Sequence, residues 1–278
     1  MPKIQIITDS GCDLPSDLLA QYNIHVLPIT VHFADQLYRD GVDLSAEEFY
    51  QRLKTAQVPP NTSQINPDQY LKAYQQYDQE TQLLVIGLSS KLTGSLQSAE
   101  LAKRLLQRDA VYIFDSKSAS LGLGLCVLKA AEYVAEGLSI EQVITRLKVY
   151  QQQAYGLFVL DSLKHLLRTG RLSKPEAALG SMLNIKPILW FAPTGEVLVK
   201  EKVRSFTKAL STIIERFKEA EIDFANATLA IAHANCLSIA EDYAAEVERE
   251  LKPKRIIVNI AGSAIGTHVG QGGIGLFH

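Results

Sequence analysis

Four hydroxyl side chains gather within seven residues, directly after an apolar run at residues 83–88. They belong to Ser89, Ser90, Thr93 and Ser95. A helical pattern follows, and the start of a helix offers free backbone N–H groups and a positive dipole end, which suits an anion. Serine and threonine are also preferred helix caps, so one hydroxyl has an ordinary structural explanation. No G-x-x-x-x-G-K-[ST] phosphate loop is present, and both interpretations stay open.

Two further segments carry polar side chains that could reach a ligand. Residues 59–64, which include Thr62, form a predicted loop before a helix that begins near residue 67, and a turn plus a cap explains them most simply. Gly170 is expected to end another helix in the left-handed conformation, with Arg171 just beyond it. An isolated arginine is usually solvated, so neither segment identifies a site by itself.

The segment 262–275 is unusual because it holds six glycines in fourteen residues. This density predicts tight backbone turns or a close approach to another segment or a ligand. His268 is the one titrating residue within the segment. A buried histidine with satisfied hydrogen bonds is the simplest interpretation of it, and a role at a site is the alternative.

The elements that must position these residues alternate between strand and helix in the first half of the chain. Apolar runs at residues 3–8, 83–88 and 110–114 predict buried strands, and helices are expected at about 120–135 and 139–152. This alternation predicts a parallel sheet with helices on its faces. Ligands of such sheets bind beyond the carboxyl ends of the strands, where the four hydroxyls lie.

The second half of the chain predicts a mixed sheet. Segments 185–191 and 196–200 flank an Ala-Pro-Thr-Gly turn and form a predicted hairpin, which a purely parallel sheet does not contain. Further strands are expected at 228–232 and 255–260. We therefore predict an α/β protein of two domains, 1–154 and 155–278, although composition does not mark the boundary. The tail could pack back on the interface between them.

Composition excludes several classes of function. A net charge of −2 over 278 residues gives the molecule as a whole no electrostatic attraction for nucleic acid or for an anionic membrane. Cys12, Cys126 and Cys236 are too scattered for a disulfide framework or a metal knuckle, which favours a reducing compartment. We see no signal peptide and no apolar run of the roughly 18–20 residues that a membrane span needs. A cytoplasmic location without membrane insertion is expected.

Several segments, spread over the chain in order, resemble the DegV family, which includes the fatty-acid-binding subunits of bacterial fatty acid kinase. The segments that carry the resemblance are 8–14, 62–64, 90–99, 170–173, 186–188 and 266–270. The resemblance implies two different α/β domains, the first with a parallel sheet in three layers and the second with a mixed sheet packed on helices. It also implies that a long-chain fatty acid lies between them in an apolar tunnel.

Individual residues take their implied roles from this resemblance. The hydroxyls of Thr62 and Thr93 match those that bind the fatty acid carboxylate, and the backbone amide of Gly94 lies nearby in the family. Arg171 and His268 match a second pair of residues, beside those hydroxyls, that organises the carboxylate end of the tunnel. A nearby Arg171 or a protonated His268 would favour the ionised form of the acid. The family often has serine at the position of Thr93, so the added methyl group is expected to narrow the pocket. No cofactor or metal is implied beyond the fatty acid itself.

The resemblance implies a carrier and not an enzyme. The bound carboxylate would be presented to a separate ATP-binding fatty acid kinase subunit, whose acyl phosphate product feeds phospholipid synthesis, and Arg204 is the best match for a docking residue. The sequence shows no Walker motif, kinase glycine loop or evident carboxylate cluster for Mg²⁺. Two alternatives remain: a hydrolase or transferase that uses Ser or Thr with His268, although no G-x-S-x-G elbow is present, and a binder of a phosphate-bearing small molecule.

Overall fold

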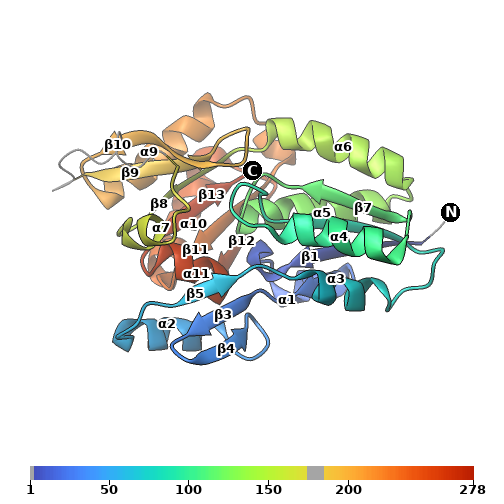
Figure 1. The fold of residues 1–278 in the computed structure, drawn as a ribbon. Helices are drawn as coiled ribbons and strands as arrows, with labels where there is room; N and C mark the ends of the chain where they lie inside the picture. The colour runs from blue at the N-terminus through green and yellow to red at the C-terminus, as the bar shows by residue number, and fades with distance from the viewer. Residues whose placement is uncertain (1–2, 174–184) are drawn as a thin grey trace.

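The computed structural model describes residues 3–173 and 185–278, whose strands form three sheets (Figure 1). The first sheet is parallel, with the strand order β2-β1-β6-β7. Its strands are β1 (Ile4–Asp9), β2 (His25–Leu27), β6 (Gln82–Gly87) and β7 (Val111–Asp115). Every residue of β6 after the first is buried, which requires helices on both faces of the sheet.

Helices cover this parallel sheet as the alternating pattern predicts. They are α1 (Ser16–Gln21), α3 (Pro67–Tyr74), α4 (Ser95–Leu106), α5 (Leu121–Ala135) and α6 (Ile140–Gln153). Helix α3 packs on α4, which contacts β6 and β7, while α6 packs on α5, which contacts β1 and β6. A capping box of Asn66 and Gln69 and a proline at the first turn explain where α3 begins.

The second sheet is mixed and has six strands in the order β10-β9-β8-β13-β11-β12. Its strands are β8 (Gly156–Val159), β9 (Lys186–Phe191), β10 (Val197–Val203), β11 (Thr228–His233), β12 (Arg255–Ile260) and β13 (Ile274–Phe277). Strands β11 and β12 are parallel, and the other pairings are antiparallel, including the predicted hairpin of β9 and β10. Helices α9 (Phe206–Glu219) and α10 (Leu237–Leu251) pack against this sheet and against each other.

Helix α5 lies between the two large sheets. It contacts β1 and β6 of the parallel sheet and also β11 and β13 of the mixed sheet. Its sequence is accordingly apolar almost all round, and nine of its fifteen residues are buried. The fold class is therefore the predicted one, a parallel sheet followed by a mixed sheet packed on helices. The boundary at residues 154 and 155 stays a prediction, because α5 shares its packing with both sheets.

A small antiparallel sheet completes the described fold and corrects one expectation. It consists of β3 (Thr30–Phe33), β4 (Gln36–Arg39) and β5 (Asn61–Ser63), with α2 (Ala46–Thr55) nearby. Residues 61–63 are therefore a strand and not a loop, because β3 pairs with their backbone even though no apolar alternation marks them. The glycine-rich tail forms helix α11 (Ser263–Val269) and strand β13, and its glycines confirm the expected close approach to other segments, since a Cβ atom on Gly266 would lie 2.6 Å from Phe49.

Candidate functional site

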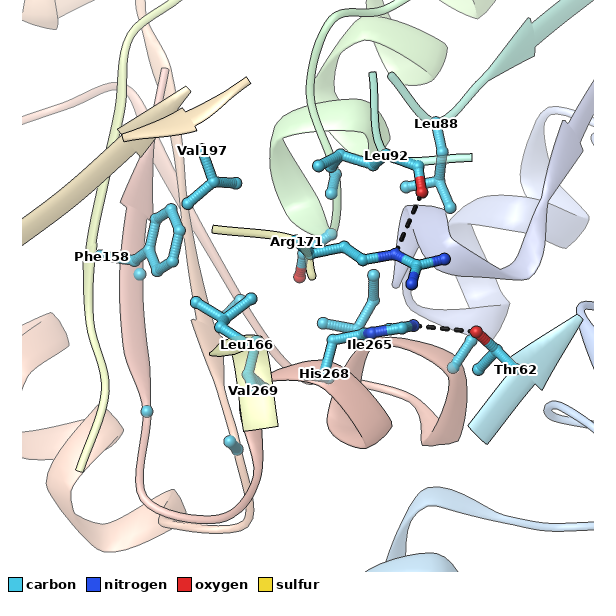
Figure 2. Close-up of a pocket in the computed structure, with 18 of the residues that line it drawn as sticks. Thr62, Leu88, Leu92, Phe158, Leu166, Arg171, Val197, Ile265, His268 and Val269 are labelled. Carbon is cyan, nitrogen blue, oxygen red and sulfur yellow. Dashed lines mark hydrogen bonds between the residues drawn. The ribbon is translucent and has the colours of Figure 1, made fainter. Parts of the chain in front are cut away.

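A cavity of about 280 Å³ lies between the parallel and the mixed sheet. The loops that follow β6 and β7 form one wall, with Leu88 and Ala119 among the lining residues, so the cavity adjoins the carboxyl ends of those strands. The mixed sheet contributes Phe158, Val197 and other apolar side chains on the opposite side (Figure 2). Most of the lining side chains are apolar, which is typical of a small-molecule site.

A threonine and a histidine meet at the polar end of the cavity. Strand β5 carries Thr62, and α11 carries His268, which is 206 residues away in the sequence. The Nε2 atom of His268 and the Oγ1 atom of Thr62 are 2.9 Å apart, as Figure 2 shows. Because α11 packs against β3 and β5, the small sheet and the glycine-rich tail together build this contact.

The electrostatics at His268 correct one expectation. Burial, followed by the positive charges of Arg171 and Arg168 and the nearby His165, lowers the pKa of His268 to about 3. The imidazole is therefore neutral near pH 7, and it does not supply the positive charge that a carboxylate was expected to meet. Its Nδ1 atom is buried and has no hydrogen-bond partner among the described residues.

Thr93 lies in a chain of hydrogen bonds at the start of α4. The backbone N–H of Ile65 donates to Ser95 Oγ over 3.2 Å, and Ser95 Oγ lies 3.0 Å from Thr93 Oγ1. The backbone N–H of Ser95 also donates to Thr93 Oγ1 over 3.3 Å. These bonds connect the segment after β5 to the loop before α4, so they fix Thr62 and Thr93 relative to each other.

Gly94 sits beside a polar side chain that the sequence alone did not assign to the site. A Cβ atom at residue 94 would lie 2.2 Å from the Gln64 side-chain oxygen, so any larger residue at this position would displace the end of the Gln64 side chain. Gln64 is exposed, lines the cavity and donates through Nε2 to Ser98 Oγ over 3.2 Å. The resemblance did place Gln64 in a matching segment, but only the folded contact shows that it reaches the cavity.

Two guanidinium groups give the polar end its positive charge. Arg171 follows Gly170, which ends α7 (Lys164–Arg168) at the predicted positive φ of 67°. Its Nε donates to Leu92 O over 3.3 Å, and Nη1 donates to the carbonyl of Thr169, so the side chain is held between Leu92 and His268 (Figure 2). Arg168 bonds the carbonyl of Pro60 over 2.7 Å, close to the same end.

This arrangement suits an anion better than nucleophilic catalysis. The Thr62–His268 contact has the distance of a nucleophile and its base, but the base lacks a group that orients it, since Nδ1 is unpartnered in the described chain. A pKa near 3 also makes His268 a weak general base at neutral pH. Hydroxyl donors beside a guanidinium are instead well suited to a carboxylate.

Arg204 lies outside this cavity. It is exposed between the end of β10 and the start of α9, and it does not line the cavity. Within residues 3–173 and 185–278, no three His, Cys, Asp or Glu side chains are grouped so that they could hold a metal ion. None of the described helices is long and apolar enough to cross a membrane.

Comparisons with known proteins show the family and the fold to which this chain is similar. The family model described as "Uncharacterised protein, DegV family" matches residues 3–278. The DegV domain-containing protein TTE1491 of Caldanaerobacter subterraneus is 36% identical over 278 residues, covering 100% of this chain and 99% of that protein.

Two solved structures are similar as well. DegV, a fatty acid binding protein from Bacillus subtilis, has a TM-score of 0.91 at 31% identity, covering 100% of this chain and 99% of its own. A fatty-acid-binding DegV family protein from Thermus thermophilus has a TM-score of 0.90 at 29% identity, covering 99% and 98%. The chain belongs to the DegV family.

Proposed function

We propose that this protein binds a long-chain fatty acid in the cavity between its large sheets, with the carboxylate at Thr62 and Thr93. The observation that carries the proposal is the polarity of the cavity: a mostly apolar wall ends at two hydroxyls and the guanidinium of Arg171. The similar proteins of Bacillus subtilis and Thermus thermophilus are described as fatty acid binding, which supports the same ligand class here.

The two ends of the cavity contribute differently to binding. Hydroxyl and amide donors at the polar end satisfy the carboxylate and fix its orientation, with Gly94 and Gln64 beside them. The apolar wall supplies most of the affinity, since each buried methylene group contributes about 0.8 kcal/mol. A long chain thus gains on the order of 10 kcal/mol before the costs of ordering are subtracted. The largely apolar wall favours this ligand over a small phosphate-bearing one.

We further propose that the protein is a carrier that presents the carboxylate to a separate ATP-dependent kinase subunit. The acyl phosphate formed there would enter phospholipid synthesis. The resemblance of the site segments supports this division of labour, and the polar end lies near the surface, where Ser63 and Gln64 are exposed. Arg204 is the proposed contact for the kinase.

Native mass spectrometry of the purified full-length protein tests the ligand. We expect a retained or added mass that matches a long-chain fatty acid, in a one-to-one complex that survives gentle desalting. A retained nucleotide or sugar phosphate, or no binding after delipidation and incubation with palmitate or oleate, would contradict the proposal.

A reconstitution with a fatty acid kinase subunit tests the carrier role. ATP consumption is expected to require both this protein and a fatty acid, and Arg204→Glu should reduce it without changing fatty acid binding. Turnover of acyl esters by the isolated protein that disappears in His268→Ala would instead support an enzyme that uses the Thr62–His268 pair.

A further inference from the structure

Three phenylalanine rings from neighbouring strands meet in the cavity wall. The ring centroids of Phe158 (β8) and Phe191 (β9) are 5.4 Å apart, and those of Phe191 and Phe277 (β13) are 6.4 Å apart. All three residues line the cavity. In Figure 2, Phe158 lies on the side of the cavity opposite to Thr62. The rings therefore form an apolar wall away from the hydroxyls.

The ring of Phe277 is held by glycines on both of its edges. Gly156 is its partner in the β8–β13 ladder, and a Cβ atom there would lie 2.6 Å from Cδ1 of the ring. A Cβ atom on Gly275 would lie 2.7 Å from Cε2, and one on Gly122 of α5 would lie 3.1 Å from Cδ1. The ring occupies this position because three neighbouring residues lack a side chain, so a side chain added at one of them would displace it.

Phe277 also separates the cavity from the protein interior beyond it. The residue is only 3% exposed and contributes to the cavity wall, whereas Gly122 and Gly156 do not line the cavity in the part of the chain that is described. Strand β13 begins at Ile274, a few residues after the end of α11, and ends at Phe277. Four residues of an antiparallel strand span about 14 Å. An acyl chain that lies along β13, with its carboxylate beside His268, would meet this ring with its methyl end.

We propose that Phe277 sets the maximum length of the acyl chain that the cavity accepts. The inference rests on the proposed function, because it takes a fatty acid as the ligand. A ring packed closely at the end of the cavity leaves no space for a further methylene group to be buried. A longer acid must then bend or leave methylene groups unburied, and each one left out lowers affinity about fourfold.

A mixture of ligands measures this limit. The delipidated protein is incubated with an equimolar mixture of even-numbered saturated fatty acids from lauric to arachidic acid, and the bound acids are extracted and quantified. In Phe277→Leu the shorter side chain opens space, so the preferred acid is expected to be about two carbons longer, with a roughly fifteenfold change in the ratio of the two acids.

A second variant moves the limit in the opposite direction. The φ angle of Gly156 is not in the left-handed region, so Gly156→Ala is tolerated by the backbone while its methyl group pushes the ring toward the cavity. The preferred acid should then be shorter than in the wild-type protein. Phe33→Ala is the matched control, because that ring packs on Phe49 and does not line the cavity.

The outcomes separate the two proposals. Opposite shifts in Phe277→Leu and Gly156→Ala, with no shift in Phe33→Ala, support the assignment. The wild-type length profile in both variants would overturn the role of Phe277 while leaving fatty acid binding intact. Failure of the wild-type protein to bind any acid of the mixture would overturn the proposed function itself. If Phe277→Leu does not fold, Gly156→Ala decides alone.

An isotope-filtered NOE from the terminal methyl group of bound ¹³C-labelled palmitate to the ring of Phe277 provides a check in the wild-type protein, and its absence would count against the assignment.

Discussion

The directions of the hydrogen bonds at the polar end decide which protons remain for a ligand. Ser95 Oγ accepts the N–H of Ile65, and either hydroxyl can donate in its contact with Thr93 Oγ1. When Ser95 is the donor, Thr93 keeps its hydroxyl proton for a carboxylate. Thr62 keeps its proton only if the neutral His268 carries its proton on Nε2 and donates it to the threonine oxygen. The site thus provides two hydroxyl protons directed by neighbouring groups.

Removing one of these hydroxyls should weaken fatty acid binding. Thr93→Val keeps the shape of the side chain but loses a hydrogen bond to a charged group, which corresponds to a loss of about 1.5–3 kcal/mol in binding free energy. Titration calorimetry with palmitate measures the change. Thr145→Val is the matched control, because that exposed hydroxyl only bonds the carbonyl of Glu141 within α6. Equal affinities of the two variants would refute the role of Thr93.

The protonation of His268 is a separate prediction. With a folded pKa of about 3, against an ordinary value of 6.5, the unfolded chain binds more protons between these pH values. The free energy of unfolding should therefore fall as the pH drops below 6.5, with His268 contributing up to about 1.4 kcal/mol per pH unit. The ¹⁵N shifts of the imidazole are expected to show a neutral ring with the proton on Nε2 near neutral pH. A charged ring under those conditions would contradict the assignment.

At the scale of elements, α11 depends on residues from the other end of the sequence. Its N-cap is Gly262, which has no side chain, so distant carboxylates satisfy its first N–H groups. Asp13 Oδ1 accepts from Gly262 N over 2.8 Å, and Asp40 Oδ1 accepts from Ser263 N over 2.8 Å. Both carboxyl groups are buried, and desolvation raises the pKa of each above its usual range. They connect the helix that carries His268 to the N-terminal half of the chain.

Loss of Asp40 should therefore affect both stability and binding. Asp40→Ala leaves the backbone N–H and the hydroxyl of Ser263 without their acceptor, which costs about 1–3 kcal/mol in the free energy of unfolding. Fatty acid affinity should fall with it, since α11 positions His268. Asp43→Ala is the control, because Asp43 is exposed and pairs only with Arg39. Chemical denaturation measures the free energy of unfolding of both variants, and calorimetry measures their fatty acid affinity. Equal values for Asp40→Ala and Asp43→Ala would contradict the proposed role of Asp40 in positioning α11.

Periodicity predicted the elements that bury an apolar face and missed those that do not. Strand β6, α5 and the β9–β10 hairpin carry clear patterns, and each was expected close to its observed position. Strand β5 is three polar residues long, and α11 contains a glycine, so their local sequences predict neither element. Both exist because tertiary contacts satisfy their backbones. The proposal that Thr62, Thr93 and His268 are site residues came from the resemblance, whereas their contacts could be seen only in the fold.

At the scale of the whole molecule, the β9–β10 hairpin is fastened to the parallel-sheet half of the chain. Ser89 is fully buried, and its hydroxyl donates to the carbonyl of Gly195 over 2.7 Å. Gly195 has a φ of +92°, and a Cβ atom there would lie 2.3 Å from Ser89 Oγ and 3.2 Å from Lys117 Cα. Because the hairpin also carries Phe191 and Val197, this contact closes one side of the cavity.

Disturbing this contact should cost more than backbone strain alone. Gly195→Ala combines the strain of a positive φ with a steric clash, whereas Gly137→Ala has a similar φ of +81° and no neighbour within 4 Å. The first variant is expected to lose about 1–3 kcal/mol more in the free energy of unfolding than the second. Equal losses in denaturant unfolding would show that the hairpin tip does not hold the two halves together.

A crystal structure of the protein with bound palmitate would locate the carboxylate and the acyl chain. We expect one carboxylate oxygen within hydrogen-bond distance of Thr62 Oγ1 or Thr93 Oγ1, the guanidinium of Arg171 nearby, and the acyl chain between the two large sheets. A carboxylate bound elsewhere, a chain inserted in the reverse direction, or palmitate found only on the outer surface would contradict this expectation.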